Sequence, residues 1–159
     1  MRACARIFFL LGLFACATAA LADTEEEKRA IGRFFGEYTS AVAGFDASRL
    51  VPYYEQPLTI VTAARTIVLK DAAEMQGFMN PFFERLKQRG GSGKAEYPQV
   101  HIRPLGPGVA LASVLVVRYK TDGEELERGG FTYVLRRTGE QWKIAVLVGH
   151  GVSGVRALD

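Results

Sequence analysis

The chain has 159 residues and a formal net charge of +3, from 20 Lys and Arg against 17 Asp and Glu. That length suits one domain with its own hydrophobic core. The basic residues are scattered along the chain, which argues against the concentrated basic stripe of a nucleic-acid-binding protein.

The first 22 residues have the pattern of a secretory signal peptide. Arg2 and Arg6 give a positive start, an apolar run follows over residues 7–17, and residues 20–22, Ala-Leu-Ala, supply a cleavage site. The apolar run is too short for a membrane span. We therefore expect export, to the periplasm or out of the cell, and a mature single domain that covers residues 23–159.

Cleavage would change both the charge and the cysteine content. Arg2 and Arg6 leave with the leader, so the 20 basic residues become 18 against 17 acidic ones. Cys4 and Cys16 leave as well, and the mature domain is expected to have neither a disulfide nor thiol chemistry. The alternative is a lipoprotein anchored through Cys16, although the bulky Phe14 stands where a lipidation box carries a small residue.

Two helices are predicted at the start of the mature domain. Thr24 and Glu27 form a capping box, and apolar residues then recur at helical spacing up to an expected end near Gly44. Asp46 is expected to cap a second, short helix, whose regularity Pro52 limits.

A β-hairpin and a third helix are predicted next. The β-branched runs at 58–62 and 66–69 are typical of paired strands. Asp71 and Glu74 form another capping box ahead of an apolar helical stripe. Pro81 falls inside that stripe and is expected to kink or split the helix.

The rest of the chain is predicted to be β-structure. Residues 90–93, Gly-Gly-Ser-Gly, are expected to form a mobile loop. Turn residues at 122–123 and 138–140 indicate two hairpins. The predicted strands cover residues 97–103, 109–120, 130–137 and 142–149. Helices followed by antiparallel strands predict an α+β fold, with a curved sheet covered on one face by the N-terminal helices.

Side-chain alternation assigns residues of the last strand to the two faces of this sheet. Trp142, Ile144, Val146 and Val148 share one face, and His150 lies at the end of the same face. This pattern predicts that the His150 ring points toward the helix-covered side.

The strand at residues 109–120 is apolar on both faces. We assign the face with Ser113 and Tyr119 to the interior and the other face to the outside. The expected outer face consists of Ala110, Ala112, Val114, Val116, Val134, Ala145 and Leu147. A sheet that is apolar on both sides is usually covered on both. We therefore expect a homodimer that pairs the outer faces, with cover by the chain's own tail or leader as the alternative.

The order of the predicted elements resembles the nuclear transport factor 2-like (NTF2-like) superfamily. The ending at residues 137–144, Arg-Thr-Gly-Glu-Gln-Trp-Lys-Ile, followed by His150, is similar to the close of SnoaL-like small domains. The resemblance covers about residues 24–150 and implies a cone-shaped α+β fold. Members include isomerases, epoxide hydrolases, dehydratases, cyclases and non-catalytic binding or assembly modules, so the fold alone does not choose a function.

Catalysis by a known set of this superfamily is not well supported by the sequence. Ketosteroid isomerases use a carboxylate base with a Tyr and a protonated Asp; Tyr38 matches the Tyr, but Thr62 stands near the position of the base. Limonene-type epoxide hydrolysis needs an Asp-Arg-Asp set, and no inward Asp pair is visible. The enzyme alternative is a lyase or isomerase that uses His150 and Tyr38. Two His without Cys make a poor metal site, and no cofactor is expected.

Aromatic and hydroxyl-bearing residues are expected to line a cavity between the helices and the sheet. The candidate ligand-binding residues are Tyr38, Tyr54, Phe78, Phe82, Ser113, Tyr119, Tyr133 and His150. Apolar walls with a few placed polar groups are typical of small-molecule sites. The predicted function is therefore binding of a small apolar or aromatic ligand by an exported protein. A filled aromatic core is the alternative, and it would make the domain a non-catalytic structural or accessory module.

Overall fold

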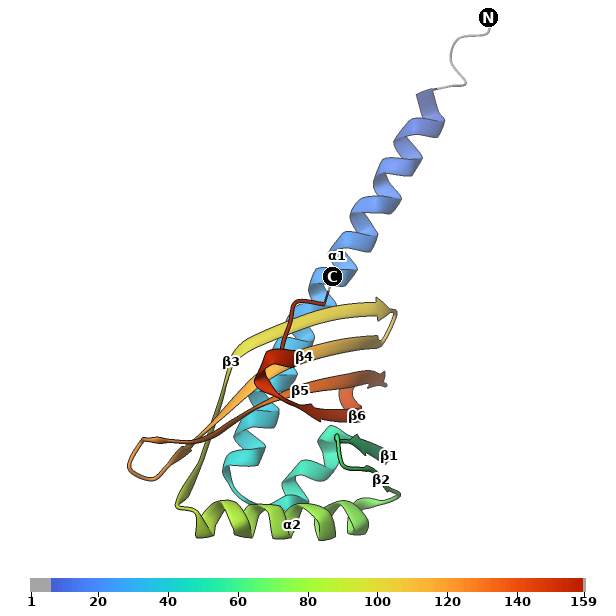
Figure 1. Ribbon diagram of the computed structural model, residues 1–159. Helices are drawn as coiled ribbons and strands as arrows, with labels where there is room; N and C mark the ends of the chain where they lie inside the picture. The colour runs from blue at the N-terminus through green and yellow to red at the C-terminus, as the bar shows by residue number, and fades with distance from the viewer. Residues whose placement is uncertain (1–6, 159) are drawn as a thin grey trace, which may run out of the picture.

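The computed structural model describes the backbone of residues 7–158 and the side chains of residues 24–158 (Figure 1). The side chains of the predicted signal peptide and its cleavage site lie outside this range. The first helix, α1 (Ile7–Ala43), continues without a break through residue 24, so the expected N-cap at Thr24 is wrong. The alanine-rich sequence before Thr24 favours helix, which explains the continuation. The end of α1 agrees with the prediction.

A short 3-10 helix and a hairpin follow α1. The 3-10 helix η1 (Ala47–Tyr53) is capped by Asp46, whose carboxylate accepts a hydrogen bond from the backbone N–H of Ser48 at 2.9 Å. Strands β1 (Tyr54–Val61) and β2 (Thr66–Leu69) pair in antiparallel fashion, as predicted.

The second long helix is α2 (Ala72–Gln88). Asp71 caps it by accepting a hydrogen bond from the backbone N–H of Glu74, while the Glu74 carboxylate accepts from the N–H of Lys70 at 2.8 Å. Pro81 lies inside α2 on its exposed side. The helix is continuous, so Pro81 does not split it, which was one of the two expected outcomes.

Four long strands complete a single curved sheet. They are β3 (Gly91–Gly106), β4 (Val109–Lys120), β5 (Glu125–Thr138) and β6 (Gln141–His150). The strand order is β2-β1-β6-β5-β4-β3, with the β1–β6 pair parallel and the others antiparallel. Figure 1 shows α1 crossing the long strands and α2 lying across one end of the sheet. The predicted α+β class with helices against a curved sheet is confirmed.

The glycine-rich segment after α2 is not a mobile loop, because β3 begins within it. A Cβ atom on Gly93 would lie 2.2 Å from the Ala43 carbonyl oxygen at the end of α1. The Ser92 hydroxyl donates to the Tyr119 carbonyl at 2.9 Å, and the Gly90 carbonyl accepts from the N–H of Thr121 at 3.0 Å. The missing side chains therefore allow the close approach of α1 and β3.

A β-bulge at Ala145 reverses the faces of β6. Leu135 of β5 pairs with Ile144, but the residue before it, Val134, pairs with Val146. Ala145 is the extra residue in this register. One inserted residue moves all later side chains to the opposite face. The prediction that His150 points toward the helices is therefore wrong.

The faces of β4 are also the reverse of the predicted ones. Ala112 pairs with Tyr133, and both belong to the core under the helices. The outward face of β4 carries Ser113, whose neighbour on β5 is Thr132. Small side chains on the inner face leave room for aromatic rings. The inner residues of β4 are Ala110, Ala112, Val114 and Val116, all at most 1% exposed.

The residues after β6 cover part of the outer face. The 3-10 helix η2 (Val152–Gly154) lies against β5, and the N–H of Arg156 donates to the Ser113 hydroxyl at 3.4 Å. Ser113 is 1% exposed as a result. The C-terminal tail thus covers this part of the outer face, as the alternative to a dimer predicted.

Candidate ligand-binding cavity

A cavity of about 190 Å³ lies between the two helices and the inner face of the sheet. Lining residues come from α1, β1, α2, β3, β4, β5 and β6. The buried end is formed by tyrosines, and the lining is most exposed near Thr62, which lies close to Gly149 and Phe131. Among the residues that the structure describes, no Asp, Glu or His lines this space.

The structure brings together some of the residues predicted to bind a ligand and separates others. The predicted residues that line the cavity are Tyr38, Tyr54, Phe78, Phe82 and Tyr133. The bulge and the reversed face of β4 place His150 and Ser113 on the outside of the sheet. Tyr119 lies at the edge, where its hydroxyl donates to a carboxylate oxygen of Glu96 at 2.8 Å.

The tyrosine hydroxyls form the polar part of the buried end. The Tyr38 and Tyr54 hydroxyl oxygens are 2.5 Å apart. Burial raises the pKa of Tyr38, Tyr54, Tyr97 and Tyr133. The hydroxyls therefore stay protonated at neutral pH and remain able to donate hydrogen bonds.

Aromatic contacts fix the positions of these tyrosines. The Tyr38 ring meets the Tyr54 ring edge-on at 5.9 Å between centroids, and the Tyr133 ring stacks on Phe131 at 6.3 Å. Phe35 of α1 also contacts Tyr133, at 5.5 Å between ring centroids. Rings in contact on several sides lose rotational freedom, so the hydroxyls are held before any ligand arrives.

Arg118 is the cavity residue that the sequence prediction missed. Its guanidinium carbon lies 5.2 Å from the centroid of the Phe82 ring, and its Nη1 donates to a Glu127 carboxylate oxygen at 3.1 Å. The side chain is 17% exposed. Alternation along the strand places Arg118 on the same face as the small residues Ala110 to Val116, and this pattern could have identified it. The sequence analysis assigned that face to the outside, so Arg118 was not considered.

The charge of Arg118 reaches the tyrosine cluster. Burial is the main cause that raises the pKa of Tyr38, Tyr97 and Tyr133, and the positive charge of Arg118 acts against this rise in each of them. Arg118 lines the same cavity as these three tyrosines.

His150 has a structural environment on the outer face. Its Nε2 lies 3.0 Å from the Thr132 hydroxyl, and its Nδ1 lies 2.9 Å from the Gly151 carbonyl oxygen. The ring fills space beside two glycines: a Cβ on Gly130 or Gly154 would lie 2.5 Å or 2.6 Å from Nδ1. A lyase or isomerase site made of His150 and Tyr38 is contradicted, because the two residues lie on opposite faces of the sheet.

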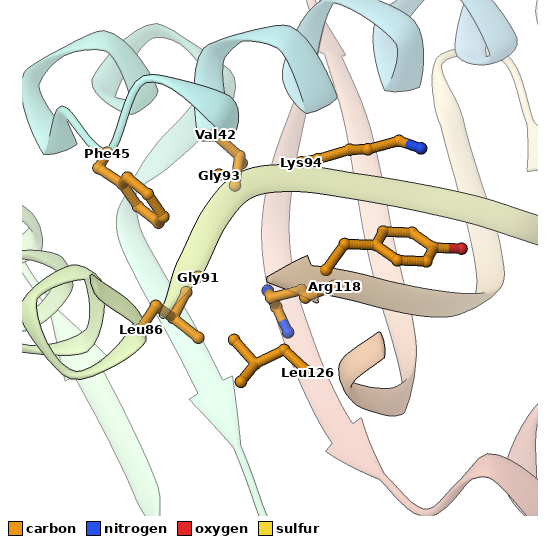
Figure 2. Close-up of a pocket in the computed structure, with 9 residues that line it drawn as sticks. Val42, Phe45, Leu86, Gly91, Gly93, Lys94, Arg118 and Leu126 are labelled. Carbon is orange, nitrogen blue, oxygen red and sulfur yellow. The ribbon is translucent and has the colours of Figure 1, made fainter. Parts of the chain in front are cut away.

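A second, smaller hollow lies near the start of β3 (Figure 2). Figure 2 shows Arg118 beside Leu126, across the hollow from Phe45. The volume of about 10 Å³ is the size of one water molecule, so this region is a packed joint between α1, α2 and the sheet.

The residues that the structure describes contain no group of three or more His, Cys, Asp and Glu that could hold a metal ion. Within the same residues, no helix is long and apolar enough to cross a membrane.

A curved, mostly antiparallel sheet with N-terminal helices and an apolar cavity between them defines the class of NTF2-like α+β proteins. The family described as NTF2-like protein (DUF6841) matches residues 25–152, and the chain belongs to this family. The superfamily resemblance predicted from the sequence is thereby confirmed. No curated protein sequence matches the chain.

Solved structures show the same architecture. An NTF2-like protein with a cystatin-like fold from Novosphingobium aromaticivorans has a TM-score of 0.65 at 14% identity, over 88% of this chain and 89% of that one. A domain of unknown function with a cystatin-like fold from Nostoc punctiforme has a TM-score of 0.63 at 19% identity, over 80% and 78%. A putative calcium/calmodulin-dependent protein kinase II association domain from Xanthomonas campestris has a TM-score of 0.60 at 13% identity, over 80% and 89%. At these identities the likeness shows the fold alone.

Proposed function

We propose that the protein binds a small apolar or aromatic molecule in the cavity between α1, α2 and the sheet. The observation that carries this proposal is the cavity of about 190 Å³ with aromatic walls and tyrosine hydroxyls at its buried end. An apolar cavity of about 150 Å³ holds benzene. The space therefore suits a ligand of about one ring, smaller than the drug-sized molecules that occupy pockets of roughly 300–1,000 Å³.

The test combines a search for a retained molecule with a variant that fills the cavity. Native mass spectrometry of protein purified from its own host should show a bound small molecule. Ala95 lines the cavity and Ala112 lies in the packed core beside it. We expect Ala95→Met to abolish retention with little loss of stability. The matched change Ala112→Met should destabilise the protein by about 1–3 kcal/mol through overpacking.

The opposite result would identify a filled core. If Ala95→Met is as destabilising as Ala112→Met, and no preparation carries a bound molecule, the domain is a structural or accessory module.

We also propose that two copies pair through the outer sheet face. Apolar residues there remain half-buried although the tail covers Ser113. They are Leu111, Val134, Val146 and Val148. Sedimentation of the wild type should show a dimer, and Val134→Glu should convert it to a monomer. A monomeric wild type would refute the proposal.

Export is the third proposal, and it rests on the sequence pattern of residues 1–22. Intact-mass measurement of exported protein should give a chain that starts at Asp23. A species that keeps Cys16 with added acyl mass would instead identify a lipoprotein.

A further inference from the structure

We propose that the ligand of this cavity is a small carboxylic acid and that Arg118 binds its carboxylate; this inference rests on the ligand-binding function proposed above. Three independent features of the described residues support it: the balance of charge around Arg118, an unpartnered donor on its guanidinium, and the polar groups on the cavity wall.

The charges around Arg118 do not balance. Glu127 accepts hydrogen bonds from Arg118 Nη1 at 3.1 Å and from Arg89 Nη1 at 2.5 Å. Two guanidinium groups thus share one carboxylate, which leaves one excess positive charge. Arg118 is the more buried of the two arginines, with 17% of its side chain exposed against 50% for Arg89. The excess charge is therefore less well solvated at Arg118, where a bound anion would neutralise it.

The guanidinium of Arg118 also has an unused donor. Its Nε is buried and has no hydrogen-bond partner in the part of the chain that the structure describes. Buried polar groups in proteins are nearly always paired, so an unpaired one calls for an explanation. A carboxylate matches the planar guanidinium fork and would accept the free N–H.

The cavity wall favours a ligand with both an apolar body and an acid. Burial keeps the hydroxyls of Tyr38 and Tyr133 protonated, so they can donate to a carboxylate but cannot repel it. The Phe82 ring, which contacts Arg118, offers an apolar surface beside the charge. The nearby Glu96 is already paired with Lys94 at 2.7 Å and does not line the cavity. Benzoate combines the required features at the size of one ring.

The experiment compares benzoate with benzamide, a neutral molecule of nearly the same shape, by calorimetric titration at pH 7 and low salt. Wild-type protein should bind benzoate more tightly. Arg118→Gln should weaken benzoate binding by about tenfold or more, the effect of losing a charge-assisted hydrogen bond, and change benzamide binding less than about twofold. Glu127→Gln should strengthen benzoate binding, because it removes the carboxylate that competes for Arg118.

The matched control is Arg128→Gln. Arg128 lies on β5 next to Glu127 and pairs with Glu125 at the surface. Its replacement by Gln removes the same charge as Arg118→Gln does. It should leave both affinities unchanged within about twofold. If Arg118→Gln does not fold, Arg118→Lys and Glu127→Gln carry the test. Arg118→Lys keeps the charge but loses the planar fork, and should also weaken benzoate binding.

The outcomes separate this inference from the function on which it rests. Equal binding of benzoate and benzamide, unaffected by Arg118 or Glu127 variants, would overturn the carboxylate assignment and leave the cavity as a site for neutral ligands. Binding of neither molecule, together with no retained molecule and an Ala95→Met variant as destabilised as Ala112→Met, would overturn both.

Discussion

At the scale of single residues, two adjacent phenylalanines of α2 have different environments. Phe83 is 1% exposed and packs edge-on against Phe45 at 5.6 Å. Phe82 is half-buried and lines the cavity below Arg118. The same substitution at the two positions therefore distinguishes a core side chain from a cavity wall.

We predict that Phe83→Ala lowers the free energy of unfolding by about 3–5 kcal/mol, because it opens a new cavity in packed surroundings. Phe82→Ala should lower it by only about 1–2 kcal/mol, the transfer free energy of a half-buried ring that already borders empty space. Urea denaturation of both variants measures the difference. Equal losses would show that the space beside Phe82 is closed in solution.

The residue composition of the cavity was predictable only in part. Tyr38, Phe78 and Phe82 lie on apolar helical stripes, and a 3.6-residue period points such side chains toward the core. Arg118 was not found, because one charged residue in an apolar strand gives no sign of the face it occupies. Its significance depends on Glu127 and Arg89, which only the folded structure brings beside it.

At the scale of elements, the strand faces show where sequence periodicity stops being informative. β6 alternates regularly in sequence, yet the bulge at Ala145 transfers His150 to the other face. Ala145 is small and apolar and carries no turn signal, so nothing in the sequence marks it. β4 is apolar on both faces, so alternation identifies two faces without saying which is inside. The tail that covers Ser113 decides the second case.

The glycines before and within the start of β3 permit a matched test of close packing between elements. Gly90 and Gly93 both have φ of +81°, but a Cβ on Gly90 would meet nothing within 4 Å, whereas one on Gly93 would lie 2.2 Å from the Ala43 carbonyl oxygen. We predict that Gly90→Ala costs about 1–2 kcal/mol from backbone conformation alone.

Gly93→Ala should cost at least about 3 kcal/mol, because it must also push α1 away from β3. Thermal unfolding of the two variants under the same conditions measures the contrast. If the two losses are equal, the end of α1 does not pack on β3 as described, and the segment is the mobile loop that the sequence suggested.

At the scale of the whole molecule, the buried tyrosines join four elements. Tyr38 belongs to α1, Tyr54 to β1, Tyr97 to β3 and Tyr133 to β5. Burial raises the pKa of each above the ordinary tyrosine value of about 10, so the folded protein holds these protons at pH values where the unfolded chain releases them. Their contribution to stability is complete below about pH 10 and is lost as the pH rises toward the folded-state pKa values.

We predict that the free energy of unfolding falls steeply above about pH 10, with a slope of up to about 1.4 kcal/mol per pH unit for each tyrosine. Tyr38→Phe should make the decline shallower. Urea titrations between pH 8 and pH 11 give the slope. A stability that does not change over this interval would mean that the hydroxyls ionise equally easily in both states.

The overall architecture was predicted more completely than the site. Helix stripes, the hairpin at residues 58–69 and the turns at 122–123 and 138–140 each have a local cause in the sequence, so their order could be derived. The parallel contact of β1 with β6 joins residues far apart in the chain, and no local pattern specifies it. The cavity depends on that contact, because both strands supply lining residues.

The contact between His150 and the tail has a spectroscopic consequence. A carbonyl oxygen only accepts hydrogen bonds, so the Nδ1 that faces the Gly151 carbonyl must carry the proton, and Nε2 then accepts from the Thr132 hydroxyl when the ring is neutral. A neutral histidine free in water favours the other tautomer, with the proton on Nε2. The ¹⁵N resonances of the imidazole thus report whether the C-terminal segment is docked on the sheet. A chain cut after His150 should lose this signature. The His150 ring therefore reports whether the last residues are docked on the sheet.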